Sequence, residues 1–556
     1  MTEANSGIRR LRILFWCAAI GLGLAETWAM RHTMASDGVS YLDMGDAYWR
    51  GDWHMAINTQ WSPMYSWFLG GALKALKPSP YWEFPVVHAV NLAIFLAALG
   101  SFEFLLRSLI DYQRKASKSL EMGSARLPEW AWCSIGYTLF LWTSFCLITL
   151  GSVSPDMLVA AFVYLAAGVL LRIRAGSTGW VTFVLLGVVL GFGYLAKAIM
   201  FPLSLVFLGV TLLSAGGWRK GMPRVLVAGA AFLAVAGPFI VALSMAMGRP
   251  TFGESGRLNY LSFVDRADFV TLPANTYKHP VTRIHETPNV YEFAHPIKGT
   301  YPLWYDLAYW SEGPKAHFDL KGQIRVLKLT GISYYNLLFL SEAGLVSGLI
   351  VLFSVSSLGF RSLLRSVSEG WYLMVPAAAG LGAFLLVHVE GRYIGPYVLL
   401  LWLGVLCGVR TKSEGESRRL IAGVVLAIAV TMGAPVFSTT VFDWAEQRHK
   451  GPVDWEVARA LKQIGIQEGD KVAYLRRSPW GDFFWARLAR IQIIAEVPPG
   501  EFDKYWAAPP PVQTEVIQAL AKTGAKAVIS AAMPPCASAS VWQRLGNTDY
   551  YAHVLP

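Results

Sequence analysis

Four short clusters of ionisable and aromatic residues could carry chemistry in this chain of 556 residues. The first cluster is acidic and follows the first apolar segment, where Asp37, Tyr41, Asp43 and Asp46 stand close together. A carboxylate can remove a proton from a hydroxyl within hydrogen-bonding distance, so Asp37 is the first candidate for a general base and Asp43 the second. Three carboxylates this close could also hold one divalent cation. The alternative is a solvated loop whose aspartates cap a helix.

The second and third clusters each contribute one charge at the edge of an apolar segment. Asp156 stands within residues 154–157, Ser-Pro-Asp-Met. An ionisable group at a membrane edge is a candidate catalytic residue, unless it only caps a helix. Lys197 closes residues 191–197, Gly-Phe-Gly-Tyr-Leu-Ala-Lys. A lysine there could neutralise a phosphate, or it could simply extend to the membrane surface.

The fourth cluster places four polar side chains in a turn between two late apolar segments. His388, Glu390, Arg392 and Tyr393 belong to residues 388–396, His-Val-Glu-Gly-Arg-Tyr-Ile-Gly-Pro. The planar guanidinium of Arg392 suits bidentate binding of a phosphate, and Glu390 could orient it. The alternative is a structural ion pair within the turn.

The composition is that of an integral membrane protein. Hydrophobic residues make up 54% of the chain and charged residues 15%, against about 25% charged in soluble proteins. The net charge of +11 could suggest a nucleic-acid partner, but the basic residues lie between the apolar segments. That pattern is typical of an orientation signal, so we expect no nucleic acid. Five cysteines without a Cys-x-x-Cys pair predict neither a disulfide framework nor a zinc site.

The apolar segments predict an α-helical polytopic protein, because one membrane span needs roughly 20 mostly apolar residues. About eleven spans are expected, near residues 12–30, 85–106, 130–149, 153–171, 178–196, 198–215, 225–246, 335–356, 371–388, 393–409 and 420–440. Basic residues such as Arg172, Arg174 and Arg219 gather in alternate connections. The positive-inside rule therefore places the N-terminus in the cytoplasm.

Three regions would then face outward, namely loops 31–84 and 247–334 and a tail from about residue 442. We expect a transmembrane domain over 1–441 and a small extracytoplasmic α/β domain over 442–556. In the tail, strand-like and helix-like stretches alternate, which favours a partly parallel sheet. The expected strands are 471–475, 491–497 and 527–529, and the expected helices begin near 454 and 514.

This topology brings all four clusters to the outer face of the membrane. A carboxylate opposite two cations suits attack on a sugar linked to a phosphate. The base would activate the acceptor, and the cations would stabilise the departing phosphate as its charge develops.

At these residues the chain resembles the GT-C superfamily of polytopic glycosyltransferases, in particular bacterial members related to protein mannosyltransferases and lipid A aminoarabinose transferases. The resemblance covers roughly residues 10–410. The matching elements are Asp37-Gly38-x-x-Tyr41, the Pro155-Asp156 turn, residues 191–197 with Pro202, and Arg392-Tyr393-Ile394-Gly395-Pro396. Ala196 and Ala198 stand where relatives often have Thr and Gly, and Gly38 stands where many have Glu. This last departure leaves Asp43 and Asp46 as rivals of Asp37.

The resemblance implies a transferase of the bacterial inner membrane that uses a polyprenyl-phosphate-linked sugar donor. The acceptor would be an external glycan, lipid or protein. Asp37, Asp43 and Asp156 are then the candidates for catalysis. Lys197, Arg392 and Tyr393 would contact the donor phosphate, supported by Tyr41, Asp46, His388 and Glu390. Some members bind a metal through external Glu and His residues, and those available here are His54, Glu254, His279, His285 and His295. Their spacing selects no ligand set, so no cofactor is assigned.

Two other classes of function compete with this one. A transporter or lipid flippase would have ionisable residues in mid-span and broken helices near the midplane. Glu26, Glu103 and Lys197 instead lie toward the ends of spans, which favours an enzyme at the surface. A membrane-anchored binding or assembly protein would act through its tail alone, and Asp37 would be dispensable.

Overall fold

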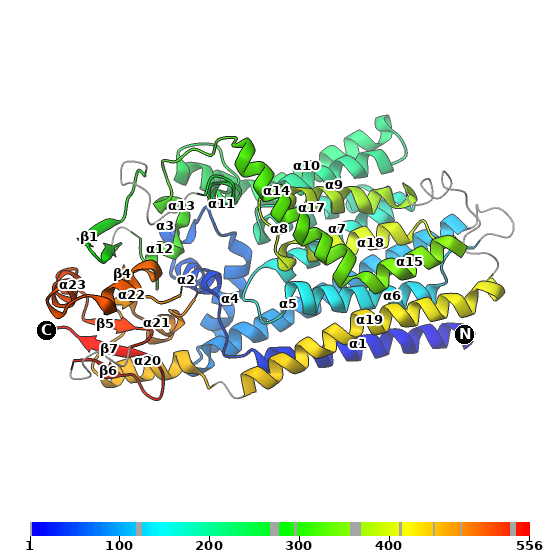
Figure 1. Cartoon of the computed structure of the whole chain (residues 1–556). Helices are drawn as coiled ribbons and strands as arrows, with labels where there is room; N and C mark the ends of the chain where they lie inside the picture. The colour runs from blue at the N-terminus through cyan, green and yellow to red at the C-terminus, as the bar shows by residue number, and fades with distance from the viewer. Residues whose placement is uncertain are drawn as a thin grey trace.

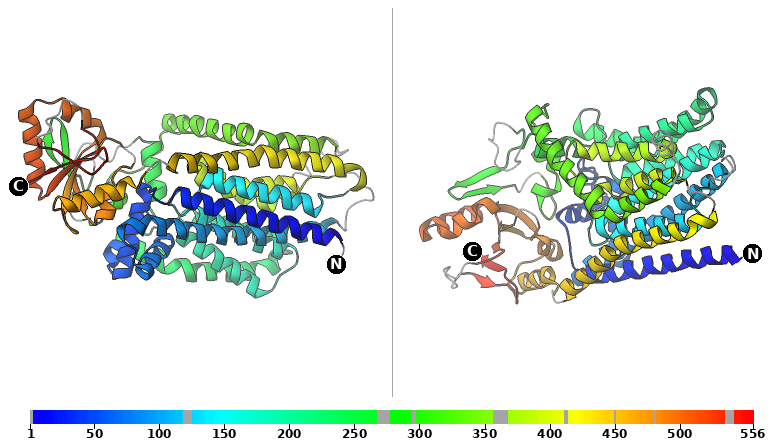
Figure 2. Two further views of the ribbon diagram at one scale, coloured as in Figure 1. Left: turned by 90° about the horizontal axis from the view of Figure 1, so that it is seen from below. Right: turned by 45° about the vertical axis from the view of Figure 1, so that its right-hand side comes forward.

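A long helical bundle carries a layer of short helices and a mixed sheet at one end (Figure 1). The two further views show the same arrangement, with the N-terminus at the end of the bundle opposite to the sheet (Figure 2). The computed structural model describes residues 3–117, 125–266, 277–293, 297–355, 368–410, 414–448, 451–478, 481–533 and 541–556.

Each predicted apolar segment coincides with a helix of the bundle. These helices are α1 (Glu3–Ala29), α5 (Pro80–Ser117), α6 (Glu129–Trp142) with its π-helical continuation η1 (Thr143–Ile148), α7 (Asp156–Arg174), α8 (Trp180–Ala196), α9 (Met200–Ser214), α10 (Trp218–Met247), α14 (Leu320–Tyr335) with η3 (Asn336–Ser341) and α15 (Ala343–Val355), α17 (Trp371–Leu385) after the short turn η4 (Ser368–Gly370), α18 (Gly391–Leu406) and α19 (Glu414–Arg448). Helices α5 and α7 pack against each other, as do α8 and α10.

Among the described helices, five are long and apolar enough to cross a membrane: α5, α6 with η1, α7, α10 and residues Arg418–Gln447 of α19. A sixth span results if Leu320–Ser341 and Ala343–Ser354 cross together, although the chain bends by 66° between them. Helices α8, α9 and α18 are apolar but shorter. The chain is therefore a helical membrane protein, and the number of eleven spans stays a prediction.

The acidic stretch forms a largely buried helix, α2 (Ser36–Arg50), and not a solvated loop. Its apolar face packs on α4 (Pro63–Leu76), where a side chain on Gly45 would come within 2.8 Å of the Ser66 carbonyl oxygen. The two helices approach this closely because Gly45 has no Cβ. The layer is completed by α3 (Trp53–Ala56), α11 (Ser255–Phe263), α12 (Pro302–Tyr305) and α13 (Leu307–Trp310).

The tail forms the mixed sheet, and the three predicted strands are confirmed. Its elements are α20 (Val453–Gln463), β3 (Lys471–Leu475), α21 (Phe484–Ala489), β4 (Gln492–Val497), α22 (Pro499–Ala507), α23 (Pro510–Lys522), β5 (Ala527–Ser530), β6 (Gln543–Arg544) and β7 (Tyr551–Val554). Strand β3 pairs in parallel with β4 on one side and β5 on the other, and β7 and β6 continue the sheet antiparallel.

The sheet also contains two strands from outside the tail. The hairpin of β1 (Thr282–Glu286) and β2 (Asn289–Glu292) comes from loop 247–334, and β2 pairs antiparallel with β4. The full order is β1-β2-β4-β3-β5-β7-β6. Helix α19 continues to Arg448, past the proposed domain boundary near residue 441. The tail and the large loop therefore share one sheet, which holds both above the end of the bundle.

Candidate active site

Two carboxylates and two cations alternate at the end of the bundle that carries α2. The Asp37 carboxylate, in the first turn of α2, lies 3.4 Å from Nη2 of Arg392. Nη1 of Arg392 lies 3.7 Å from Oδ2 of Asp156, and Nζ of Lys197 lies 2.5 Å from Oδ1 of Asp156. Four of the predicted residues, drawn from four distant segments of the chain, therefore meet at one point.

Asp156 and Lys197 are each positioned by the end of a helix. Asp156 opens α7 after Pro155, and Ser154 donates its hydroxyl to Oδ2 of Asp156 at 2.9 Å. Lys197 is the residue at which α8 ends, and its backbone is extended. Asp156 is 2% exposed, so its charge is matched inside the protein by the lysine and the arginine.

Tyr393 lies beside both cations. Nζ of Lys197 is 3.9 Å from the centroid of its ring, and the guanidinium carbon of Arg392 is 4.9 Å from the same centroid. Nη2 of Arg392 also donates to the Tyr393 hydroxyl at 3.1 Å. The face of an aromatic ring attracts cations, so Tyr393 helps to hold the two positive charges near each other.

Glu390 orients the guanidinium of Arg392 from its other side. Nε of Arg392 donates to Oε2 of Glu390 at 2.6 Å, which leaves both Nη groups directed at the aspartates. His388 lies 3.1 Å from Oε1 of Glu390 and stacks on Phe263. Burial opposes ionisation of Glu390, but the hydrogen bond to His388 and the charge of Arg392 outweigh it and lower the Glu390 pKa to about 2. The predicted cluster 388–393 thus acts as one unit.

Gly38 explains how α2 approaches the Asp156 turn. A Cβ on Gly38 would lie 2.8 Å from a methyl of Val153 and 2.7 Å from the sulfur of Met34. A larger residue at position 38 would push the first turn of α2 away from residues 153–156. Close packing beside Asp37 therefore favours glycine at position 38.

Tyr41 lies beneath Asp37 in a buried aromatic cluster. Its ring packs at 5.3 Å from Trp61 and at 5.1 Å from Tyr65, measured between centroids. The Tyr65 hydroxyl donates to Asn91 at 2.7 Å, which links the cluster to α5. Burial and the charges of Asp37 and Asp156 raise the pKa of Tyr41 well above its ordinary value, so its hydroxyl stays neutral.

Asp43 and Asp46 belong to a different network from Asp37. Nη1 of Arg487, from α21 in the tail, lies 2.9 Å from Oδ1 of Asp43 and 2.6 Å from Oδ2 of Asp46. Thr300 donates its backbone N–H and its hydroxyl to Asp43 at 2.7 and 2.9 Å. Asp46 lies nine positions after Asp37, which at about 100° per residue places it on the opposite side of the helix. These two aspartates are therefore paired within the protein.

Glu83 completes this second network. Neither Glu83 nor Arg487 is among the site residues predicted from the sequence. Nε of Arg487 lies 2.7 Å from Oε1 of Glu83, and Arg490 pairs with Oε2 of the same carboxylate. Glu83 is fully buried and Arg487 is 4% exposed. The one local signal is the pair Arg487 and Arg490 at the C-terminal end of α21, where Arg490 is the residue that ends the helix.

No group of three His, Cys, Asp or Glu residues that could hold a metal occurs among the described residues. Asp37 and the pair Asp43–Asp46 contact different arginines, so they do not converge on one cation. His279 pairs with Glu312, and Glu254 pairs with two arginines. His295 lies outside the described residues.

No family model matches the chain, and no curated protein matches it in sequence. Several solved structures do match its fold. ArnT from Cupriavidus metallidurans in the apo state superposes with a TM-score of 0.55 at 13% identity, over 100% of this chain and 99% of that chain. The same protein bound to undecaprenyl phosphate gives a TM-score of 0.53 at 14% identity, over 98% of each chain.

An archaeal protein matches over most of the same length. The Archaeoglobus fulgidus oligosaccharyltransferase in complex with zinc and sulfate has a TM-score of 0.50 at 13% identity, over 94% of this chain and 67% of that chain. The expected resemblance is therefore confirmed at the level of the fold: this integral membrane protein has the fold of the GT-C glycosyltransferases.

Proposed function

We propose that this protein transfers a sugar from a polyprenyl-phosphate-linked donor to an acceptor at the outer face of a bacterial inner membrane. The observation that carries the proposal is the meeting of Asp37, Asp156, Lys197 and Arg392 at one end of the bundle. A structure with the same fold is described as bound to undecaprenyl phosphate, which supports a lipid phosphate as the leaving group. The acceptor would be a glycan, a lipid or a protein.

Asp37 is the carboxylate best suited to act as the general base. It is 22% exposed and its contacts to Arg392 are 3.4 and 3.5 Å long, whereas Asp156 is almost fully buried and tightly paired. Asp37 would take the proton of an acceptor hydroxyl as the acceptor oxygen bonds to C1 of the sugar. The bond from C1 to the phosphate oxygen breaks on the opposite face, so the anomeric configuration is inverted.

Lys197 and Arg392 would receive the departing phosphate. Asp156 and Tyr393 hold the two cations side by side, so both charges can face one phosphate group. Groups fixed in this way stabilise developing charge without having to reorganise during the reaction. Asp43 and Asp46 would support the site through Arg487 rather than take part in proton transfer.

Turnover by the purified protein in lipid bilayers tests the proposed function. A panel of polyprenyl-phosphate sugars is supplied with candidate acceptors, and release of polyprenyl phosphate is measured. We expect release with at least one donor. Release with none of them, under conditions in which the protein moves a lipid across the bilayer, would contradict a transferase.

Lys197→Met should raise the KM for the donor about tenfold to a hundredfold, because one charge-assisted contact contributes about 1.5–3 kcal/mol. Lys197→Arg keeps the charge and should retain most of the affinity. Lys74→Met is the matched control, since Lys74 is exposed on α4 and lies over Trp49. Equal KM values for Lys197→Met and Lys74→Met would remove Lys197 from the donor site.

The pH dependence of kcat/KM should follow Asp37. Burial raises the Asp37 pKa above its ordinary value of 3.8, and the charges of Arg392 and Lys197 only partly oppose this shift. The base is active when deprotonated, so activity should be lost as the pH falls through a value above 3.8. Measuring kcat/KM from pH 3 to 8 checks this, since a loss of activity centred at or below pH 3.8 would exclude Asp37 as the controlling group.

A lipid or solute transporter is the second candidate, and one observation favours it. Glu342 stands at the 66° break between α14 and α15, is fully buried, and accepts a hydrogen bond from Trp402 Nε1 at 2.6 Å. The sequence analysis expected spans that are mostly free of mid-membrane charge and did not name this residue. A buried acid at a broken helix is typical of transporters. A lipid-translocation assay with Glu342→Gln separates the two, because a transporter should lose translocation while a transferase should keep sugar transfer.

A further inference from the structure

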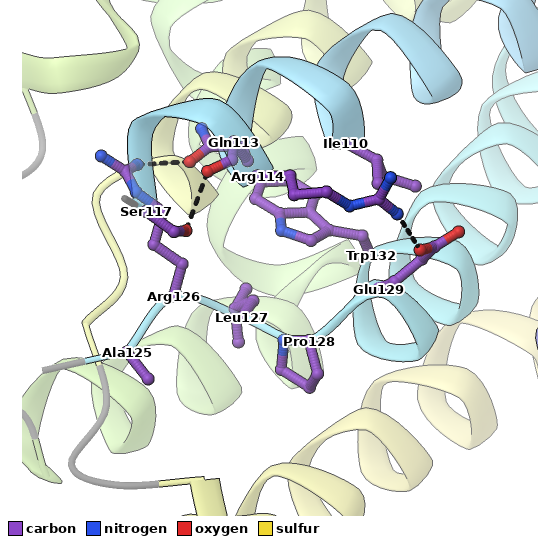
Figure 3. Close-up of a pocket in the computed structure, with 10 residues that line it drawn as sticks. All are labelled: Ile110, Gln113, Arg114, Ser117, Ala125, Arg126, Leu127, Pro128, Glu129 and Trp132. Carbon is purple, nitrogen blue, oxygen red and sulfur yellow. Dashed lines mark hydrogen bonds and ion pairs between the residues drawn. The ribbon is translucent and has the colours of Figure 1, made fainter. Parts of the chain in front are cut away.

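A cavity of about 350 Å³ opens at the end of the bundle opposite to the candidate active site. Its wall is formed by the last turns of α5 and by the segment that leads into α6 (Figure 3). The polar side chains that line it are Gln113, Arg114, Ser117, Arg126 and Glu129, with the indole of Trp132. No part of the proposed glycosyl transfer uses this cavity.

The cavity and its rim carry more positive than negative charge. Nη2 of Arg126 lies 3.1 Å from Glu369, and Arg410 pairs with the same carboxylate. Glu129 is likewise shared, by Arg114 at 2.6 Å and by a second arginine. Among the residues that line the cavity, two carry guanidinium groups (Arg114 and Arg126) and one carries a carboxylate (Glu129).

The buried polar atoms in the cavity wall that lack a partner are all hydrogen-bond donors. Within the described part of the chain, no acceptor reaches Nε1 of Trp132 or Nε of Arg126. Trp132 is 2% exposed, so the protein shields its N–H from bulk water. Burying a donor without an acceptor is unfavourable. The wall therefore lacks an acceptor, and the net positive charge of the lining favours an anion in that place.

Arg126 joins two helices beside the cavity. Burial and the charge of Arg410 lower the Arg126 pKa from its ordinary value. Besides Glu369, its guanidinium contacts the side-chain oxygen of Gln113 and the carbonyl oxygen of Cys407 at 3.2 Å. Arg126 thus ties the end of α5 to the end of α18, and an anion beside it would strengthen that junction.

We propose that this cavity binds a phosphate group, with Arg114 at the exposed mouth and Arg126 and Trp132 as donors in the wall. Planar guanidinium groups and N–H donors match phosphate oxygens well. The cavity lies at an end of the membrane bundle, where the phosphate could belong to an anionic lipid headgroup or be free in solution. Both sources present the same oxygen acceptors.

Lipid retention and thermal stability of the purified full-length chain test this site. Phosphatidylglycerol retained by the protein is counted by native mass spectrometry, with phosphatidylcholine as the zwitterionic comparison. In parallel, the unfolding temperature is followed as inorganic phosphate is added. We expect Arg126→Gln to weaken binding of the effective ligand at least about tenfold. Retention of phosphatidylglycerol without an effect of inorganic phosphate identifies a lipid, and the converse identifies free phosphate.

Two further variants make the result specific. Trp132→Phe removes one N–H and keeps an aromatic side chain, so it should fold even if Arg126→Gln does not, and it should also weaken binding. Arg107→Gln removes a positive charge from the exposed side of the same helix, outside the cavity lining, and should bind as the wild type does. Wild-type binding by both Arg126→Gln and Trp132→Phe, or no binding of either phosphate source by the wild type, would overturn the proposal.

Discussion

Replacing Asp37 by asparagine should lower kcat for release of polyprenyl phosphate by about 10²- to 10⁴-fold, the usual contribution of a general base. Asparagine has nearly the same shape and can still accept a hydrogen bond from Arg392, so the site should remain folded. The KM for the donor should not rise. Removing a negative charge beside Lys197 and Arg392 leaves them freer to bind a phosphate, which favours tighter donor binding.

Asp43→Asn is the matched control for this experiment, because it makes the same chemical change on the same helix. Asp43 faces Arg487 and Thr300, so its substitution should reduce stability while each folded molecule keeps most of its turnover. The opposite pattern, an inactive but stable Asp43→Asn protein and an active Asp37→Asn protein, would move the base to Asp43. Wild-type activity in both variants would place the base outside α2.

Replacing Arg487 by methionine should destabilise the attachment of the tail to the bundle by about 3–5 kcal/mol, the typical cost of removing one partner from a buried ion pair. Arg487 contacts Asp43, Asp46 and Glu83 at the same time, and its loss leaves these carboxylates with fewer matching charges. We expect a lower unfolding temperature and faster proteolysis at the start of the tail. Turnover should fall with it, since α2 carries both Asp43 and Asp37.

Arg490→Met provides the comparison for the Arg487 result. Arg490 is 32% exposed and, among the described residues, forms an ion pair only with Glu83, so its substitution should cost markedly less. A second substitution, Asp43→Asn in the Arg487→Met background, removes one of the stranded charges. It should therefore be less damaging there than in the wild type, which a double-mutant cycle measures. Additive effects, or equal losses at Arg487 and Arg490, would show that Arg487 does not hold the network together.

The second network also connects the tail to the helix that carries the proposed general base. Asp43 on α2 binds Thr300 from the large loop and Arg487 from the tail, and β2 of the same loop pairs with β4 of the tail. A change in the loop or in the tail would therefore reach the helix that carries Asp37. This arrangement argues against a tail that functions independently of the membrane domain.

Most of the bundle, much of the tail and several members of the candidate site could be predicted from the sequence. Apolar runs define helices of the bundle because burial in lipid requires continuous apolar surface. The strands β3, β4 and β5 are apolar on both faces, so they too stand out as short runs. Asp156, Lys197 and Arg392 are conspicuous because an ionisable residue at the edge of an apolar segment is rare and often functional.

Only the tertiary structure decided which of these charges are partners. Arg487 and Asp43 are 444 residues apart, and no local sequence pattern in either segment predicts that they pair. The hairpin β1–β2 was missed because it is a partly exposed edge of the sheet, whose strands need no continuous apolar pattern. Glu342 was missed because a single acid barely changes the hydropathy of its segment. Local patterns follow from solvation, which each segment experiences by itself, whereas ion pairs and edge strands depend on distant segments that only folding brings together.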